Sequence, residues 1–251
     1  MTWRLIIDRG DVYWNMALDE AMLLLREENK IPNTLRLYVF DPSAVTLGYH
    51  QKVEDAVDEE YLVRRGVGFT RRITGGGSVY HDKLGEVTYS VVAAIEDISQ
   101  DIEKSYELIC RGLVYAIEEL GLEAEFRPVN DVLVSNKKVS GSAQARKRNA
   151  LLQHGTLMYD TNLEELARCL RAPKEKLDSH KVRSIRERVT TLSLELERKV
   201  TRDEVVKAMI GGFGKALGIR DLKPSEYSPE ELELAQRLRR KYMSKEWIYK
   251  R

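Results

Sequence analysis

The 251-residue sequence has few cysteines and no long uninterrupted apolar run. Its two cysteines cannot build a disulfide framework, and apolar stretches such as 23–25 and 91–95 fall far short of the roughly 20 residues of a membrane-spanning helix. The N-terminus also lacks the apolar run and small-residue cleavage site of a signal peptide. These absences predict a cytoplasmic protein that does not span a membrane.

Neither sign of charge dominates, and histidine is scarce. Forty-one Lys and Arg against 40 Asp and Glu leave a formal net charge of +1, so the overall charge does not favour a nucleic-acid partner. The basic run 146–148 is more typical of a solvated or nucleotide-covering loop than of a nucleic-acid footprint. The four histidines lack the ligand spacing of a zinc site. Any partner must therefore be recognised locally.

Apolar periodicity predicts a succession of strands and helices. Residues 34–40 alternate at period two, and apolar residues recur at helical spacing from Asp101 to Leu120, with Gly121 as a C-terminal cap. Asn15 is the expected N-cap of a helix that begins at Met16. Similar patterns predict strands at 5–7, 44–48, 68–72, 86–94, 131–134, 138–141 and 154–159, and helices at 59–65, 162–170, 201–217 and 228–241.

The order of these segments predicts an α/β fold of the α+β kind. We expect a single domain over residues 1–251, with a mixed, largely antiparallel sheet flanked by helices. A hydrophobic content of 43% supports a sizeable core, and no internal repeat or linker interrupts the chain. Strands 34–40 and 44–48, separated by Asp41-Pro42, are expected to form a hairpin or adjacent pair. The alternative prediction is that residues 227–251 pack as a loosely attached extension of this domain.

The most informative segment is RRITGGGSVYHD at residues 71–82. Three consecutive glycines, Gly75–Gly77, remove every Cβ from one surface, so that backbone N–H groups could turn toward a polyanion. Arg72 offers a permanently charged fork for a phosphate, and Thr74 and Ser78 add hydroxyl donors. The alternative is a flexible hairpin tip flanked by solvated arginines.

A second polar constellation consists of Asn130-Asp131, KKVSGSAQ at 137–144 and QHGTL at 153–157. A lysine held on a strand among apolar and small residues is a compact charge suited to a phosphate or carboxylate. If Val139 faces the core, Lys137 shares its face, and Lys138 points to the opposite face, toward any ligand there. The alternative is an exposed strand with two solvated lysines.

Together these motifs resemble the lipoate-protein ligase A family of the biotin and lipoate protein ligase superfamily. The resemblance rests on RRITGGGSVYHD, NDV at 130–132, KKVSGSAQ, QHGTLM at 153–158 and IRERVTTL at 185–192, and it extends from NMALDEAM at 15–22 to the KEWIYKR ending. It implies the catalytic fold of that superfamily. It also implies an ATP-dependent ligase that activates lipoate to lipoyl-AMP and transfers the lipoyl group to a lysine of an acceptor protein.

The resemblance implies roles for individual residues. Lys138 is the implied catalytic residue, since one ammonium can contact both the carboxylate and the α-phosphate and stabilise the charge between them. Asp131 is the candidate ligand for Mg²⁺, which prefers oxygen ligands. The implied nucleotide- and lipoate-binding residues are Arg72, Thr74, Gly75, Gly76, Gly77, Ser78, Val79, Tyr80, His81, Asn130, Lys138, Ser140, Gly141, Ala143 and His154.

The resemblance also implies cofactors and partners. ATP and Mg²⁺ are the implied cofactors, with lipoate as the substrate. The implied acceptors are lipoyl domains of 2-oxoacid dehydrogenase subunits and the glycine cleavage H protein. Complete bacterial ligases of this family carry a C-terminal accessory domain, which is missing after Trp247. We therefore expect a separate small accessory subunit.

The alternative function is that of the octanoyltransferases of the same superfamily, which form a cysteine thioester with a fatty acid delivered by acyl carrier protein. Cys110 lies on the apolar face of the predicted helix 101–120, and Cys169 lies in another amphipathic helix, so neither lies beside the pocket motifs. The cysteine positions therefore favour the ligase, although NMALDEAM, KEWIYKR and GSAQAR also resemble one transferase group. The third alternative is a catalytically inactive binding module, against which the intact Arg72, glycines and Lys138 argue.

Overall fold

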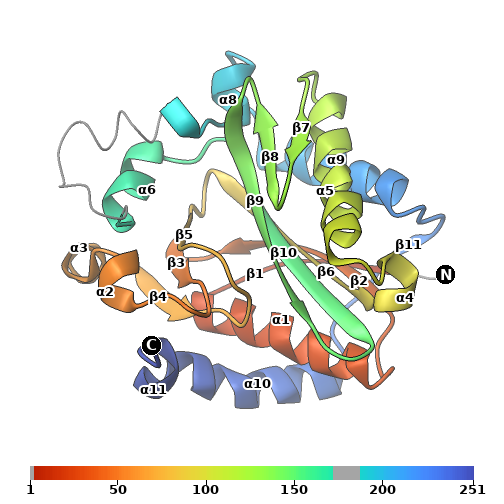
Figure 1. The fold of residues 1–251 in the computed structure, drawn as a ribbon, viewed down its shortest axis with the longest axis horizontal. Coiled ribbons are helices and arrows are strands. Elements are labelled where there is room, and N and C mark those ends of the chain that lie inside the picture. The colour runs from red at the N-terminus through yellow and green to blue at the C-terminus, as the bar shows by residue number, and fades with distance from the viewer. Residues whose placement is uncertain (1–2, 172–186) are drawn as a thin grey trace.

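A computed structural model of the chain describes residues 3–171 and 187–251 (Figure 1). The motif at 185–192 therefore begins with two residues that lie outside the described part. The larger of two sheets has eight strands in the order β11-β1-β2-β6-β10-β9-β8-β7. Its strands are β1 (Trp3–Gly10), β2 (Asn33–Phe40), β6 (Glu86–Ala94), β7 (Glu125–Arg127), β8 (Asp131–Val134), β9 (Lys137–Arg146), β10 (Ala150–Met158) and β11 (Leu222–Pro224).

The large sheet is mixed, as the sequence predicts. β1 pairs in parallel with β2 and β11, and every other neighbouring pair is antiparallel. Every residue of β6 is buried, because helices cover both faces of the sheet. The expected mixed, largely antiparallel α/β fold is therefore confirmed.

A small second sheet corrects one expectation. It has the order β4-β3-β5 and consists of β3 (Ala44–Leu47), β4 (Gly68–Arg71) and β5 (Val79–His81). The predicted pairing of strands 34–40 and 44–48 is wrong, because both edges of β2 are occupied by β1 and β6. β3 therefore pairs with β4 in parallel and with β5 antiparallel.

Two helix pairs cover the large sheet. α5 (Ile102–Glu119) and α9 (Arg202–Ala216) pack on one face, around a core that includes Val91 and Ala93 of β6. α1 (Val12–Glu27) and α10 (Pro229–Met243) lie on the other side, where α1 contacts Val92 of β6. Where α5 and α9 approach each other, a Cβ on Gly112 would lie 2.5 Å from the Phe213 ring, so this close packing requires glycine. The short helices are α2 (Val53–Ala56), α3 (Glu59–Arg65), α4 (Ile95–Ile98), α6 (Leu163–Cys169), α8 (Leu192–Glu195) and α11 (Lys245–Ile248).

The start of α1 differs from the prediction. Asp11 is the N-cap, since its carboxylate accepts a hydrogen bond from the backbone N–H of Trp14 at 2.8 Å. Asn15 lies inside the helix instead, where it is fully buried and its amide donates to the carbonyl of Gly10. The helix therefore begins four residues earlier than its apolar pattern indicates.

The C-terminal segment is an integral part of the fold. Ala235 and Tyr242 of α10 are fully buried against α1. The guanidinium of Arg71 donates hydrogen bonds to the carbonyls of Trp247 and Ile248, and the Trp247 indole donates to the Arg71 carbonyl at 2.7 Å. The alternative of a loosely attached extension is therefore wrong.

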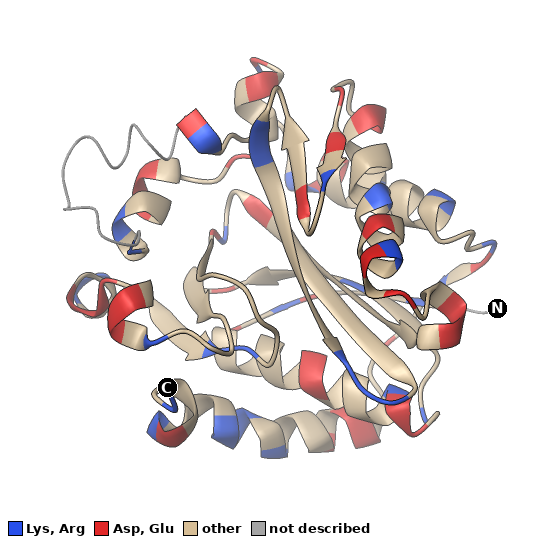
Figure 2. Ribbon diagram, in the orientation of Figure 1, with Lys and Arg blue, Asp and Glu red and all other residues tan. Residues whose placement is uncertain are grey.

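Charged residues of both signs are interspersed on the outer helices, while the central strands carry few (Figure 2). This distribution agrees with the near-neutral net charge. Of the helices that the structure describes, none combines the length and apolar composition needed to cross a membrane.

Candidate functional site

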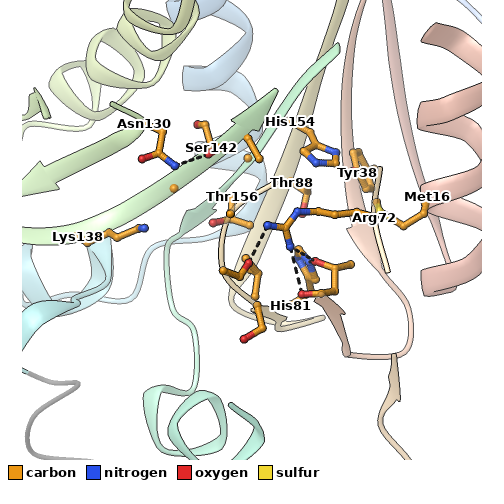
Figure 3. A pocket seen from close by; sticks show the side chains of 18 residues that line it. Met16, Tyr38, Arg72, His81, Thr88, Asn130, Lys138, Ser142, His154 and Thr156 are labelled. Carbon is orange, nitrogen blue, oxygen red and sulfur yellow. Dashed lines mark hydrogen bonds between the residues drawn. The ribbon is translucent and has the colours of Figure 1, made fainter. Parts of the chain in front are cut away.

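A cavity of about 120 Å³ lies where the α1 face of the large sheet meets the small sheet. On this face the paired strands β6 and β10 change from apolar to polar together: Val92 lies opposite Leu152, whereas Thr88 lies opposite Thr156. The apolar part packs under α1, and the polar part lines the cavity. The lining residues are Met16, Tyr38, Thr46, Arg72, Gly76, Gly77, Ser78, Val79, His81, Thr88, Asn130, Lys138, Gly141, Ser142, Ala143, His154, Gly155 and Thr156 (Figure 3).

The glycine loop between β4 and β5 folds around its own arginine. Nη2 of Arg72 donates to the carbonyls of Gly75 and Gly77 at 2.6 and 2.7 Å, so these carbonyls face the guanidinium. Gly76 has a φ of +89°, a conformation that favours glycine. The loop also packs tightly on Gly48, where a Cβ would lie 1.9 Å from the Gly76 carbonyl oxygen. The glycines therefore shape the loop around Arg72.

Arg72 is an unusual buried cation. Its side chain is 5% exposed, and it forms no ion pair with a carboxylate of the described residues. Burial lowers the pKa of Arg72 to about 10, because removal from water disfavours the charged form. The cavity therefore has a fixed positive charge on the side of the small sheet.

Lys138 lines the opposite side of the cavity, on β9 (Figure 3). Its ammonium lies 2.6 Å from Oδ1 of Asp131, and both side chains are about one-third exposed, at 37% and 32%. Strict alternation would place Lys138 on the opposite face from Gly141 and Ala143, yet all three line the cavity. A β-bulge resolves this, since Ser140 pairs with Val132 and Lys138 pairs with Leu133, leaving Val139 as the extra residue.

Gly141 gives the lysine its room. A Cβ at this position would lie 2.6 Å from Nζ and 2.7 Å from Cε of Lys138. The side chain of Lys138 therefore crosses the strand over Gly141. Beside it, the amide of Asn130 donates to the carbonyl of Ser142 at 2.6 Å.

The structure brings most of the sequence-predicted site residues together around the cavity, with five exceptions. Thr74, which is buried, and Gly75, which is partly exposed, contact Arg72 but do not line the cavity. Tyr80 points to the opposite side of β5 from its neighbours Val79 and His81 and packs in an apolar cluster. Ser140 is fully buried beside the bulge.

The fifth exception is Asp131, the candidate Mg²⁺ ligand. It lines a larger neighbouring groove of about 640 Å³ rather than the cavity itself. Gly77, Ser78 and Lys138 line both spaces, so the groove leads into the cavity at the lysine. Within residues 3–171 and 187–251, no group of three or more His, Cys, Asp or Glu side chains could hold a metal ion.

Seven lining residues are not among the predicted binding residues, although four of them lie in the motifs at 15–22, 137–144 and 153–157. Thr88 and Thr156 carried a signal, because polar residues alternate with apolar ones in the strands 86–94 and 154–159. Met16 reaches the cavity from α1, within the motif at 15–22, and Tyr38 reaches it from β2, where no motif marks it. The remaining three are Thr46, Ser142 and Gly155.

Both cysteines of the chain are fully buried. Cys110 lies beneath the cavity, with Sγ 3.6 Å from Oγ of Ser142, and burial raises the pKa of its thiol to about 11. Cys169 packs in the apolar cluster around the small sheet. A buried thiol with a raised pKa is a poor nucleophile, because the thiolate is the reactive form.

The fold and the polar cavity define the class of this protein. The chain belongs to the lipoyl protein ligase A/B catalytic domain family, which it matches over residues 11–214. It is an acyltransfer enzyme of the superfamily that contains the lipoate ligases and the octanoyltransferases.

Relatives of assigned function are similar over their whole length. The chain is 37% identical to octanoyltransferase LipM of Kyrpidia tusciae and 34% identical to octanoyltransferase LipM of Bacillus subtilis, with 100% of this chain and 99% of each relative covered. The alignment with the Kyrpidia protein runs over 275 positions, more than the 251 residues of this chain, so that relative has inserted residues without a counterpart here.

Solved structures of lipoate ligases are similar as well. A bipartite lipoate protein ligase from Thermoplasma acidophilum is 32% identical, with a TM-score of 0.88 and coverage of 99% of this chain and 96% of that one. A lipoate-protein ligase A bound with ATP is 31% identical, with a TM-score of 0.85 and coverage of 99% of both chains.

These relatives correct the main functional expectation. The sequence predicts an ATP-dependent lipoate ligase, but full-length relatives at 30–37% identity are octanoyltransferases. The prediction of a ligase is therefore wrong, and the alternative, octanoyl transfer, agrees better with the relatives. The burial of both cysteines away from the pocket motifs therefore does not separate a ligase from a transferase in this chain.

Proposed function

We propose that this protein transfers an octanoyl group from a thioester on acyl carrier protein to the ε-amine of a lysine in a lipoyl domain. The observation that carries the proposal is the full-length similarity to the octanoyltransferases of Kyrpidia tusciae and Bacillus subtilis. The cavity supports it, because Met16, Val79 and Ala143 offer apolar contacts while Arg72 and Lys138 bring positive charge.

The chemistry needs a positive charge at the carbonyl oxygen. Attack of the amine on the thioester forms a tetrahedral centre with an anionic oxygen, which a cation close to that oxygen stabilises. Lys138 is suited to this role, since its ammonium lines both the cavity and the groove that leads to it. Asp131 holds the ammonium from the groove side.

Neither cysteine of this chain is placed to form an acyl-enzyme. Cys110 and Cys169 are both fully buried, and the thiol of Cys110 has a raised pKa. The proposed reaction is therefore a direct aminolysis. The amide bond forms between the acyl carbon and the lysine nitrogen, the C–S bond breaks, and the departing thiolate takes up the proton that the amine loses. Positioning of the two reactants then supplies most of the rate enhancement.

The partners follow from this reaction. The groove of about 640 Å³ is the route by which an acyl-bearing arm or a lipoyl-domain lysine reaches Lys138. The acceptors named from the resemblance, lipoyl domains of 2-oxoacid dehydrogenases and the glycine cleavage H protein, stay the proposed acceptors. The small accessory subunit was expected from ligases, and it stays a prediction.

The test is acyl transfer with purified components. The protein is mixed with octanoyl-acyl carrier protein and an apo lipoyl domain, and intact-mass spectrometry follows the acceptor. We expect one octanoyl group on the acceptor without ATP, and the same product from a Cys110→Ala, Cys169→Ala double variant. Modification that requires ATP and a free acid would contradict the proposed reaction. Loss of transfer in the double variant, with its melting temperature still above the assay temperature, would contradict the direct step.

A further inference from the structure

Two histidines of the cavity have the same pattern of hydrogen bonds, which the proposed reaction does not use. In each, Nδ1 contacts a buried carboxylate and Nε2 contacts a threonine hydroxyl. Each of the two threonines in turn contacts the guanidinium of Arg72. Two chains of the form carboxylate–histidine–threonine thus meet on one arginine from different elements of the fold.

The first chain starts on α1. Nδ1 of His154 lies 2.8 Å from Oδ2 of Asp19, and Nε2 lies 2.7 Å from Oγ1 of Thr74. Nε of Arg72 donates to the same Thr74 oxygen at 2.9 Å. Asp19, His154 and Thr74 are all at least 94% buried, so water does not compete for these bonds.

The second chain starts on β6. Nδ1 of His81 lies 2.7 Å from Oε1 of Glu86, and Nε2 lies 3.0 Å from Oγ1 of Thr46. Nη1 of Arg72 donates to the carbonyl and hydroxyl oxygens of Thr46 at 3.3 and 3.4 Å. The ring of His81 also stacks on Phe40, with centroids 3.8 Å apart, which fixes its plane.

The donors and acceptors in the first chain determine one tautomer. The pKa of Asp19 is lowered, so its carboxylate is ionised and can only accept, which places a hydrogen on Nδ1 of His154. In the neutral ring, Nε2 then accepts from the Thr74 hydroxyl, whose oxygen accepts from Nε of Arg72. Burial, the largest cause, and the charge of Arg72 lower the pKa of His154, which agrees with a neutral ring. Nδ1 of His81 faces Glu86 and its Nε2 faces Thr46 in the same arrangement.

We infer that His154 and His81 are positioning residues that hold Arg72 through Thr74 and Thr46. The carboxylates fix the tautomers, the rings orient the threonine hydroxyls, and the hydroxyls fix the plane of the guanidinium. Arg72 has no carboxylate partner among the described residues, so its charge is not neutralised and acts across the cavity. The inference rests on the proposed acyl transfer only in that kcat is one of its readouts.

The two chains differ in how closely they reach the arginine. Thr74 lies 2.9 Å from Nε, whereas Thr46 lies 3.3 to 3.4 Å from Nη1. Hydrogen bonds weaken with distance, so the first chain should contribute more. Loss of Thr74 is therefore expected to affect the reaction more than loss of Thr46.

Hydroxyl-deleting variants test the inference through kinetics. We expect Thr74→Val to lower kcat about tenfold with KM nearly unchanged, because a buried hydrogen bond to a charged group is lost. Thr74→Ser keeps the hydroxyl and should restore most of the rate. Thr46→Val should lower kcat a few-fold. Adding His154→Gln to Thr74→Val should lower kcat little further, because His154 and Thr74 belong to the same chain of hydrogen bonds. Adding Thr46→Val to Thr74→Val should lower kcat by the product of the two single effects, because the two threonines belong to separate chains.

Nitrogen-15 NMR of the histidine rings tests the inference without any substrate. The His154 ring should show the neutral Nδ1–H tautomer at pH 7.5, and Thr74→Val should change the shifts of His154 but not those of His81. An Nε2–H tautomer at His154 would overturn the inference, as would multiplicative losses from Thr74→Val and His154→Gln. If no octanoyl transfer is found at all, the proposed function fails, while the tautomer of His154 still decides whether its hydrogen-bond chain exists.

Discussion

The two sides of the cavity hold their positive charges in different ways. Arg72 is 5% exposed, and its three nitrogens donate to oxygens of the glycine loop and of two threonines. Lys138 is about one-third exposed and pairs with one half-buried carboxylate, Asp131. The arginine is fixed by its surroundings, whereas the lysine keeps rotational freedom and access to the groove.

This difference indicates a division of labour. A fixed cation stabilises negative charge that develops in the transition state without any cost in free energy for moving the cation into place. A partly exposed lysine can leave Asp131 and follow the reacting oxygen, at the low energetic cost of breaking a partly exposed ion pair. We therefore expect activity to depend, on the Arg72 side, on the residues that hydrogen-bond to the arginine. On the Lys138 side, we expect it to depend on how far the lysine side chain can extend.

The largest effect is expected from Lys138→Ala. Loss of the cation nearest the reacting carbonyl should lower kcat by about 100- to 1000-fold. The melting temperature should fall by no more than about 3 °C, because a partly exposed ion pair contributes at most about 1 kcal/mol. Steady-state kinetics and a thermal melt measure the two quantities. Near-normal transfer by this variant would remove the lysine from the mechanism.

An intermediate effect is expected from Gly141→Ala. The new Cβ would occupy the space of Nζ and Cε of Lys138 and force its side chain aside. Because the obstructed group is the end of a flexible side chain, we expect kcat to fall about tenfold with little change in stability. Gly214→Ala on α9, where a Cβ meets nothing within 4 Å, is the matched control. It should leave kcat unchanged and stabilise the helix by about 0.5 to 1 kcal/mol. Equal effects of the two substitutions on kcat would show that the position of the Lys138 side chain over Gly141 does not affect the reaction.

The smallest effect is expected from pH, on the Arg72 side. Burial lowers the pKa of His154 in the folded protein below its ordinary value of about 6.5, against the opposing effect of Asp19. The unfolded chain then binds more protons in this range, so the free energy of unfolding falls as the pH drops below about 6.5 and levels off below the folded pKa. The charged and titratable groups that act on His154 are Asp19 from α1, Arg72 beside the glycine loop and His81 from β5.

Urea melts between pH 5 and pH 8 measure this dependence. The contribution of His154 to the slope of the free energy of unfolding against pH should not exceed about 1.4 kcal/mol per pH unit, and His154→Gln should reduce the total slope. Asp19 acts in a separate window: burial opposes its ionisation, but the hydrogen bond from His154 and the charge of Arg36 keep its pKa below the usual value. Its contribution is lost only below about pH 4. A slope that His154→Gln leaves unchanged would assign the effect to another group.

Local sequence patterns predict most of the helices and strands, but they do not predict which strands pair with each other. The helix over 102–119 and the strand over 86–94 were recognisable because their periodicity is strong. The predicted pairing of strands 34–40 and 44–48 is wrong because β1, which α1 separates from β2, and β6, which lies much further along the chain, occupy both edges of β2. The cap at Asp11 was missed because the apolar pattern of the helix starts later.

The same division holds for the candidate site. Arg72 and Lys138 were visible in the sequence as charged residues beside glycines and small residues, but Tyr80 was included and Thr46 was missed. Tyr80 turns away because strand residues alternate between faces. Thr46 contributes through contacts to His81 and Arg72, which are 35 and 26 residues away in the chain. No local pattern contains such contacts.

The sequence by itself determined the order of the strands and helices, the glycine loop and the identities of its charged residues, because these depend on local periodicity and residue chemistry. Only the tertiary structure decided how they meet. The bulge at Val139 places Lys138 on the same face as Gly141, and the burial of Asp19 and Glu86 directs two histidines toward Arg72. The link between Asp19 and His154 joins residues 135 positions apart in the chain, and the bulge depends on how β9 pairs with β8, so neither outcome is contained in the pattern of a single segment.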